Sequence, residues 1–125
     1  MRYVLGSFTL ALLVAAIVIG APARRSSAAA AQDVQVIEIV AERFSFTPSE
    51  IRVKAGTRLE IRLRSEDTVH GFHIVGTDIN LELPKRGRGD TTVMFQPQAG
   101  RYTFECSHLC GAGHSFMRGV IIATN

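Results

Sequence analysis

Metal-ligating residue types are concentrated in two short segments of the 125-residue chain. Both cysteines and two of the four histidines fall between Cys106 and His114, and Met117 follows three residues later. The other two histidines lie together in the sequence His70-Gly-Phe-His73. These side chains offer thiolate, imidazole and thioether donors, a combination that selects copper over hard cations. The two segments therefore indicate a soft metal site, with copper as the expected ion.

The cysteine-containing segment is expected to be a loop that is held at both ends. It lies between two strand-like runs, Tyr102–Phe104 and Val120–Ile122. Gly111 and Gly113 allow its backbone to wind tightly around an ion. His70 would come from a neighbouring strand, and ligands from distant parts of a chain make a site rigid. Rigidity favours electron transfer over substrate chemistry.

The same residues are compatible with three alternatives to a copper site that uses both thiols. A disulfide between Cys106 and Cys110 would enclose only three residues and leave His114 and Met117 without a role. Structural zinc could use the two cysteines and two histidines, although Met117 is a poor zinc ligand. A mononuclear copper site needs only His70, Cys110, His114 and Met117, which leaves Cys106 unused. The sequence excludes none of the three alternatives. Each of them, however, gives a role to fewer of the cysteine, histidine and methionine residues than a copper site that uses both thiols.

The elements that must position these residues are short strands. Leu59–Leu63 alternates apolar and charged residues, which predicts a strand with one buried face. Ile79–Leu83 alternates again and stops at Pro84, and no segment shows a sustained helical period. Seven to nine such strands, separated by turns, predict an all-β antiparallel sandwich or barrel. His73 should point away from His70 if their segment is a strand, and we interpret it as a surface or supporting residue.

The amino-terminal segment predicts export. Residues 1–23 contain an uncharged apolar stretch that suits either a cleaved signal peptide or a membrane anchor, and we favour the anchor slightly. Residues 24–33 form a Ser/Ala-rich linker, and the folded domain is expected to span 34–125. Either interpretation places that domain in the periplasm or on the outer face of the cytoplasmic membrane.

Composition and charge exclude several classes of protein. A chain that is 46% hydrophobic and 20% charged is not disordered, and two cysteines are too few for a disulfide scaffold. The net charge of +3 suggests nucleic-acid binding only until the charges are located. Arg2, Arg24 and Arg25 precede the domain, which itself holds 11 basic and 10 acidic residues. We therefore expect no nucleic-acid partner.

The ligand types and their spacing resemble those of a known family. The segment from Cys106 to Met117 resembles the binuclear copper A (CuA) loop of haem–copper oxidase subunit II, whose pattern is Cys-x-x-x-Cys-Gly-x-x-His-x-x-Met. The stretch Asp67–Asn80 is also similar to that family, and most of all to the single-anchor subunit II of the B-type oxidases. The resemblance covers nearly all of residues 34–125, and the loop motif is highly specific.

The resemblance implies a fold and a set of ligands. The fold is a cupredoxin-like Greek-key β-sandwich, here preceded by one hydrophobic N-terminal helix. In the family's site both cysteines bridge two copper ions, each copper has one histidine, and a methionine and a backbone carbonyl are weak ligands. Carried over, the implied ligands are the side chains of His70, Cys106, Cys110, His114 and Met117 and the carbonyl of His108.

The resemblance also implies a function. Such a centre accepts one electron from a cytochrome c or a small copper protein and passes it to haem in the catalytic subunit I of the oxidase. A free-standing periplasmic copper carrier, or a copper chaperone or storage protein, is the alternative. The six ligands leave no open position for a substrate, so the chain alone is not expected to be catalytic, although an oxidase complex containing it would be.

Two departures from the family pattern matter. Many members carry Glu at the position of His108, where the side chain helps to bind magnesium, so we expect no magnesium ion here. The chain has no Trp to serve as the electron-entry residue. Phe44 or Phe46 could take that role by analogy with the single-anchor type, and at least one of them is expected to be ordinary core.

Overall fold

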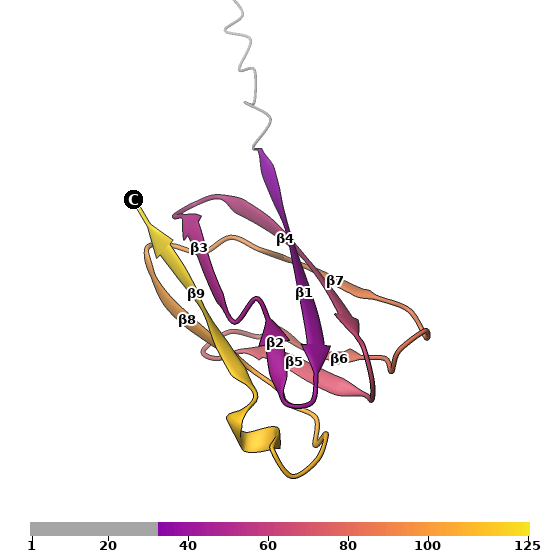
Figure 1. Cartoon of the computed structure of the whole chain (residues 1–125). Helices are drawn as coiled ribbons and strands as arrows, with labels where there is room; N and C mark the ends of the chain where they lie inside the picture. The colour runs from indigo at the N-terminus through magenta and orange to yellow at the C-terminus, as the bar shows by residue number, and fades with distance from the viewer. Residues whose placement is uncertain (1–32) are drawn as a thin grey trace, which may run out of the picture.

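Alternating apolar residues build two β-sheets that face each other across a common core. The computed structural model describes residues 33–125 (Figure 1). Its elements are β1 (Val34–Glu42), β2 (Ser45–Thr47), β3 (Glu50–Lys54), β4 (Arg58–Ser65), β5 (His70–Ile74), β6 (Asn80–Leu83), β7 (Thr91–Phe95), β8 (Gly100–Glu105), the short 3₁₀ helix η1 (His114–Phe116) and β9 (Arg118–Thr124). The predicted all-β sandwich is thereby confirmed.

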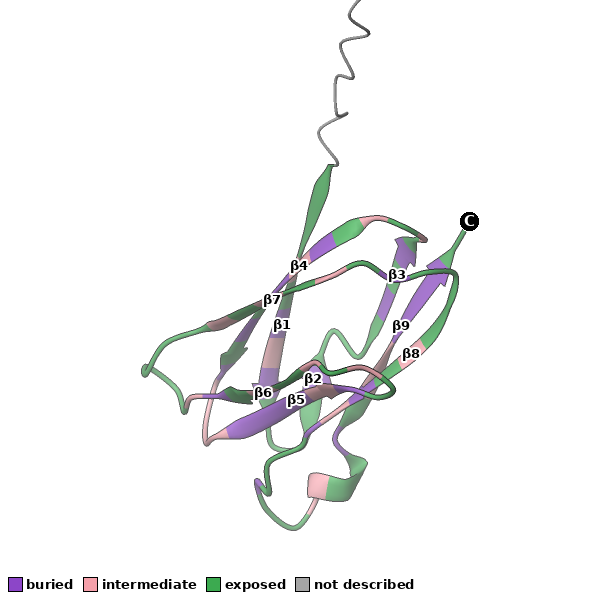
Figure 2. Cartoon of the chain, turned by 180° about the vertical axis from the view of Figure 1, so that it is seen from behind, coloured by how far each residue is buried: buried purple, intermediate pink, exposed green. Residues whose placement is uncertain are grey.

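In β4 the apolar residues are buried and the arginines are exposed, as the alternation in its sequence predicts. Leu59, Ile61 and Leu63 are buried, whereas the arginines between and after them are exposed. Strand β5 is covered on both faces, with His73 its only residue that is not fully buried. Figure 2 shows buried residues on strands of both sheets, including most of β5. The core therefore runs between the sheets and reaches the strand that carries His70.

The sheets are mixed rather than purely antiparallel. One sheet has the order β2-β1-β4-β7 and the other β3-β9-β8-β5-β6. Strand β1 pairs with β4 in parallel, and β3 pairs with β9 in parallel. The prediction of an antiparallel sandwich was wrong for these two pairs, because alternation reports which face of a strand is buried and not the direction of its neighbour.

Three phenylalanines from both sheets interlock in the core. The rings of Phe46, Phe72 and Phe104 have centroids 5.2–5.9 Å apart, within the range of favourable aromatic pairs. Phe46 is almost fully buried, as expected for a core residue. Phe44 is 38% exposed, so of the two candidate electron-entry residues it alone reaches the surface.

The loop between β8 and β9, which includes η1, projects from one end of the sandwich. The start of β1 and the C-terminus lie at the opposite end (Figure 1). Within residues 33–125, no helix has the length and hydropathy that a membrane span requires. The N-terminal helix predicted for residues 1–23 lies outside the described residues.

Candidate metal centre

Two cysteine thiols form the middle of the site. Cys106 directly follows β8, and Cys110 lies four residues further along the loop. Their Sγ atoms are 3.7 Å apart, and both side chains are buried. Both are free thiols, so the disulfide considered from the sequence is not present between them. Their sulfur atoms face one another and are available as ligands.

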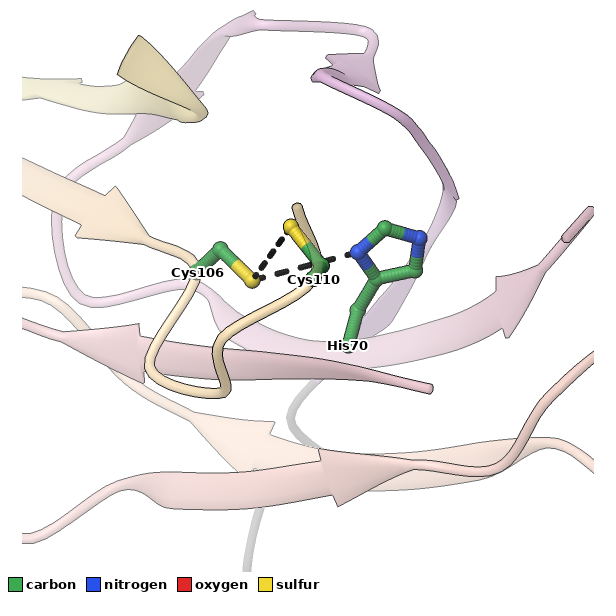
Figure 3. Close-up of side chains that lie close together, drawn as sticks. All are labelled: His70, Cys106 and Cys110. Atoms are coloured by element: carbon green, nitrogen blue, oxygen red, sulfur yellow. Dashed lines mark hydrogen bonds between the residues drawn. The ribbon is translucent and has the colours of Figure 1, made fainter. Parts of the chain in front are cut away.

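His70 joins the two thiols from the first position of β5. Its ring is completely buried, and Nδ1 lies 3.9 Å from the Sγ atom of Cys106. Ligand atoms of His70, Cys106 and Cys110 all lie within 4.8 Å of one another. Figure 3 shows the imidazole and the two sulfurs converging. As expected, a neighbouring strand delivers this histidine to the loop.

Asp67 fixes the orientation of His70, a role that the sequence pattern did not indicate. Its Oδ1 lies 2.6 Å from Nε2 of His70, which leaves Nδ1 turned toward the sulfurs. Backbone amides of Arg43 and Thr68 also donate to this carboxylate. Partial burial raises the pKa of Asp67, but hydrogen bonds from His70 and these two amides outweigh it and hold the pKa below its usual value. Its position three residues before a candidate histidine ligand is the sequence feature that could have identified Asp67 as the partner of His70.

Replacing Asp67 with asparagine is expected to weaken copper binding about tenfold or more, because partners of a ligating histidine typically contribute that much to metal affinity. The amide can still accept the hydrogen bond, but the charge that makes the imidazole a stronger donor is lost. Competition with a copper chelator measures the effect. Asp78→Asn, at an exposed aspartate, is the matched control. Equal affinities in the two variants would contradict this role of Asp67.

His114 and Met117 lie next to the sulfur of Cys110. Nδ1 of His114 is 3.8 Å from Sγ of Cys110, and Sδ of Met117 is 3.9 Å from the same sulfur. Met117 is buried, and its backbone carbonyl accepts a hydrogen bond from the amide of Cys106 at 3.0 Å. This bond ties the two ends of the loop together, so the donors between β8 and β9 hold a fixed spacing.

His108 turns its side chain away from the sulfurs. The ring is exposed, with Nδ1 3.6 Å from a carboxylate oxygen of Glu82. Its carbonyl oxygen points inward and lies 3.1 Å from the Sγ atom of Cys106. The backbone of this residue, and not its imidazole, is therefore the group that faces the site.

The distances between these donor atoms suit a soft metal. With metal–ligand bonds of about 2.0–2.3 Å, two ligands at a tetrahedral angle lie roughly 3.3–3.8 Å apart. The sulfur–sulfur, sulfur–nitrogen and sulfur–thioether separations of 3.7–3.9 Å are close to that range. Two sulfurs, two imidazoles and a thioether also match the ligand preference of copper. The residues present therefore fit the ion that the sequence predicts.

The metal-free Cys110 thiol is protonated at neutral pH. Burial, followed by the neighbouring Cys106, raises the pKa of Cys110 to about 11. Because a metal binds the thiolate, binding at this site must displace protons. The low polarity that raises the pKa also keeps water away from the sulfurs.

Phe44 packs directly on the glycines of the loop. A Cβ atom built on Gly111 would lie 2.9 Å from the Phe44 ring, and one on Gly113 would collide with the same ring. Gly111 also has a φ of +144°, which side chains rarely adopt. Both glycines thus allow the aromatic ring to approach the metal loop.

His73 lies outside the site. It is partly exposed on the outer face of β5, and Nδ1 lies 3.9 Å from a carboxylate oxygen of Glu105 on β8. The odd spacing from His70 predicted this opposite orientation. The structure thus separates the two histidines of the His-Gly-Phe-His sequence into one buried donor and one surface residue.

Comparison with known proteins places the sequence in a family. Residues 9–123 match the family described as "Cupredoxin-like domain". Cytochrome c oxidase subunit 2 of Thermus thermophilus is 36% identical over 87 residues, which cover 69% of this chain and 63% of the relative. The chain spans about half to two thirds of the length of the curated Thermus relatives it matches.

Solved structures agree with the sequence matches. A chain from a haem–copper terminal oxidase dimer superposes with a TM-score of 0.60 at 32% identity, covering 71% of this chain and 64% of that one. The periplasmic domain of cytochrome oxidase subunit II from Bradyrhizobium japonicum gives a TM-score of 0.65 at 17% identity over 73% of this chain and 84% of that one, which supports the fold. The chain therefore belongs to the cupredoxin-like family, with a domain of the type found in subunit II of cytochrome c oxidase.

Proposed function

We propose that this chain transfers electrons through a binuclear copper centre of the CuA type, as part of a haem–copper oxidase. The observation that carries the proposal is the arrangement of the donors around the sulfur pair. His70 lies next to Cys106, whereas His114 lies next to Cys110. Two separate imidazoles thus lie beside the sulfur pair, and two ions that share both sulfurs require one imidazole each.

A single ion fits this arrangement less well. Four ligands of one tetrahedral ion would all lie within about 3.8 Å of one another. The group of donors within 4.8 Å of one another contains His70, Cys106 and Cys110 but not His114. A mononuclear copper site would also leave one buried thiol unused. The first point counts against structural zinc, and both points count against a single copper ion.

The chain's own residues keep the site rigid. When bound, the copper pair supplies a one-electron redox centre. Asp67 holds the ring of His70, and the carbonyl of Met117 holds the amide of Cys106. Cys106, Cys110 and Met117 are all buried. A site whose donors are held by such contacts and are mostly buried changes little in geometry when an electron arrives, which favours fast transfer.

The surface around the loop suits a redox partner. Leu109 is 77% exposed and Phe116 79% exposed, and each adjoins a proposed ligand in sequence. Exposed apolar side chains that cluster beside a site are typical of protein contact surfaces. We propose that a cytochrome c or a small copper protein docks here and that Phe44, which packs on the metal loop, is the residue through which the electron enters.

The acceptor is proposed to be haem in the catalytic subunit I. The relatives from Thermus and Bradyrhizobium are oxidase subunits, which supports an oxidase complex as the partner and an exported location. We propose that residues 1–23 anchor the chain to the membrane and that the domain faces the periplasm. The enzymatic activity then belongs to the complex and not to this chain alone.

The full chain, purified in detergent and reconstituted with copper, tests the proposal. We expect two coppers per chain and rapid reduction of the centre by a reduced cytochrome c. One copper per chain, or a preference for zinc, would contradict the binuclear site. A pull-down from solubilised membranes then separates the oxidase subunit from a free-standing carrier, because only the former retrieves a haem-containing catalytic subunit.

Substituting Met117 with leucine is expected to leave both coppers bound and to shift their reduction potential. Leucine fills the buried volume of methionine at little cost, but it removes the thioether 3.9 Å from the Cys110 sulfur. Weak axial ligands tune copper potentials. Potentiometric titration measures the shift. Met94→Leu, at an exposed methionine of β7, is the matched control, and equal potentials in both variants would count against ligation by Met117.

A further inference from the structure

The chain segment from Cys106 to His108 lies directly on the backbone of β5. A Cβ atom built on Gly71 would lie 2.6 Å from the amide nitrogen of His108 and 2.7 Å from that of Ser107, and it would collide with the Ser107 hydroxyl. Only glycine permits an approach this close. The position of the segment is therefore determined by the absence of a side chain on the neighbouring strand.

Two hydrogen bonds fasten the same segment to the sheet. The amide of Gly71 donates to the Sγ atom of Cys106 at 3.4 Å. The Ser107 hydroxyl donates to the side-chain oxygen of Asn80 at 2.6 Å. Asn80 lies on the edge strand β6, directly opposite His73 of β5. The segment is thus held by both β5 and β6.

The group that this attachment positions is the carbonyl of His108. Its oxygen lies 3.1 Å from the Sγ atom of Cys106, and its residue follows Ser107 directly. A shift of Ser107 would move this oxygen relative to the sulfur. A carbonyl that is a weak ligand is sensitive to such a shift, because its distance sets how strongly it stabilises the oxidised metal.

We propose that Gly71 and Asn80 are positioning residues, which set the distance of the His108 carbonyl from the metal centre through their contacts with Ser107. This inference rests on the proposed copper function. The side chain of Asn80 hydrogen-bonds to Ser107 and not to a donor atom of the proposed centre, so its effect passes through Ser107. Strands β5 and β6 then influence the reduction potential of the centre through this contact, in addition to the ligand His70 that β5 provides.

A double-mutant cycle of Asn80→Ala and Ser107→Ala tests the proposal. Each single variant should retain two coppers, bind them about tenfold more weakly and show a higher reduction potential, because the oxidised form loses support from the carbonyl. The double variant should match the single variants, since both remove the same hydrogen bond. In the metal-free chain, ¹⁵N relaxation should show lower order parameters at Ser107 and His108. Gln35→Ala, at an exposed strand amide of the other sheet, is the control.

Gly71→Ala should produce larger shifts in the same direction, since a methyl group would displace the segment outright. If that variant does not fold, the double-mutant cycle of Asn80 and Ser107 is sufficient to test the proposal. Order parameters and potentials that equal those of the control would overturn the positioning role, and so would additive effects in the double variant. Failure of the parent chain to bind two coppers would instead contradict the copper function, so the two failures are distinguishable.

Discussion

Replacing Cys106 with serine is expected to abolish the two-copper site and to leave at most one copper per chain. The Sγ atom of Cys106 lies within 4 Å of the Cys110 sulfur, of His70 Nδ1 and of the His108 carbonyl. A serine hydroxyl is a harder and far less acidic donor, so it cannot replace a thiolate shared by two ions. Metal analysis and the visible spectrum of the reconstituted chain measure the loss.

Cys110→Ser is the matched variant, since its sulfur is the other half of the pair. Both variants should fold, because a buried hydroxyl costs only about 1–3 kcal/mol even when it lacks a partner. Circular dichroism of the metal-free proteins checks that point. Two coppers retained in either variant would refute the shared role of the thiols.

Removal of copper is expected to lower the melting temperature by roughly 15–30 °C. The proposed donors come from β5, from the loop after β8 and from η1, so a bound metal joins segments that unfolding must separate. A ligand present at about a thousand times its Kd adds about 4 kcal/mol to the free energy of unfolding. For a domain of this size, each kcal/mol corresponds to about 4–8 °C.

Calorimetry of the copper-loaded and the chelator-treated chain measures this difference. The Cys106→Ser variant should show a much smaller gain on adding copper, which separates specific binding from a general effect of the ion. Equal melting temperatures for the loaded and metal-free parent chain would argue that the donors are not assembled around a metal.

The strands were predictable because they depend on local sequence, and the candidate donors could be identified from their residue types and from the family motif. Alternation in Leu59–Leu63 reports one buried face, and the odd spacing of His70 and His73 reports opposite directions. The pairing of β1 with β4 was not predictable, because strand direction depends on how the chain crosses between sheets. The fold class therefore followed from pattern, whereas the mixed topology did not.

The supporting residues of the site escaped prediction for a related reason. Asp67 and Gly71 act through contacts that exist only once β5 lies against the loop. Phe44 and Phe46 could not be separated on spacing, since two residues apart on one strand they would share a face. Phe44 instead lies in the turn between β1 and β2, which leaves it partly exposed against Gly113 while Phe46 enters the core.

Electron spin resonance of the copper-loaded chain tests the central claim most directly. The account predicts one unpaired electron shared equally between two copper nuclei, because two thiolates placed 3.7 Å apart can bridge both ions and delocalise the charge. The hyperfine pattern of two equivalent coppers would carry that signature. A pattern from a single copper nucleus, in a chain that has taken up its full complement of metal, would contradict the binuclear centre.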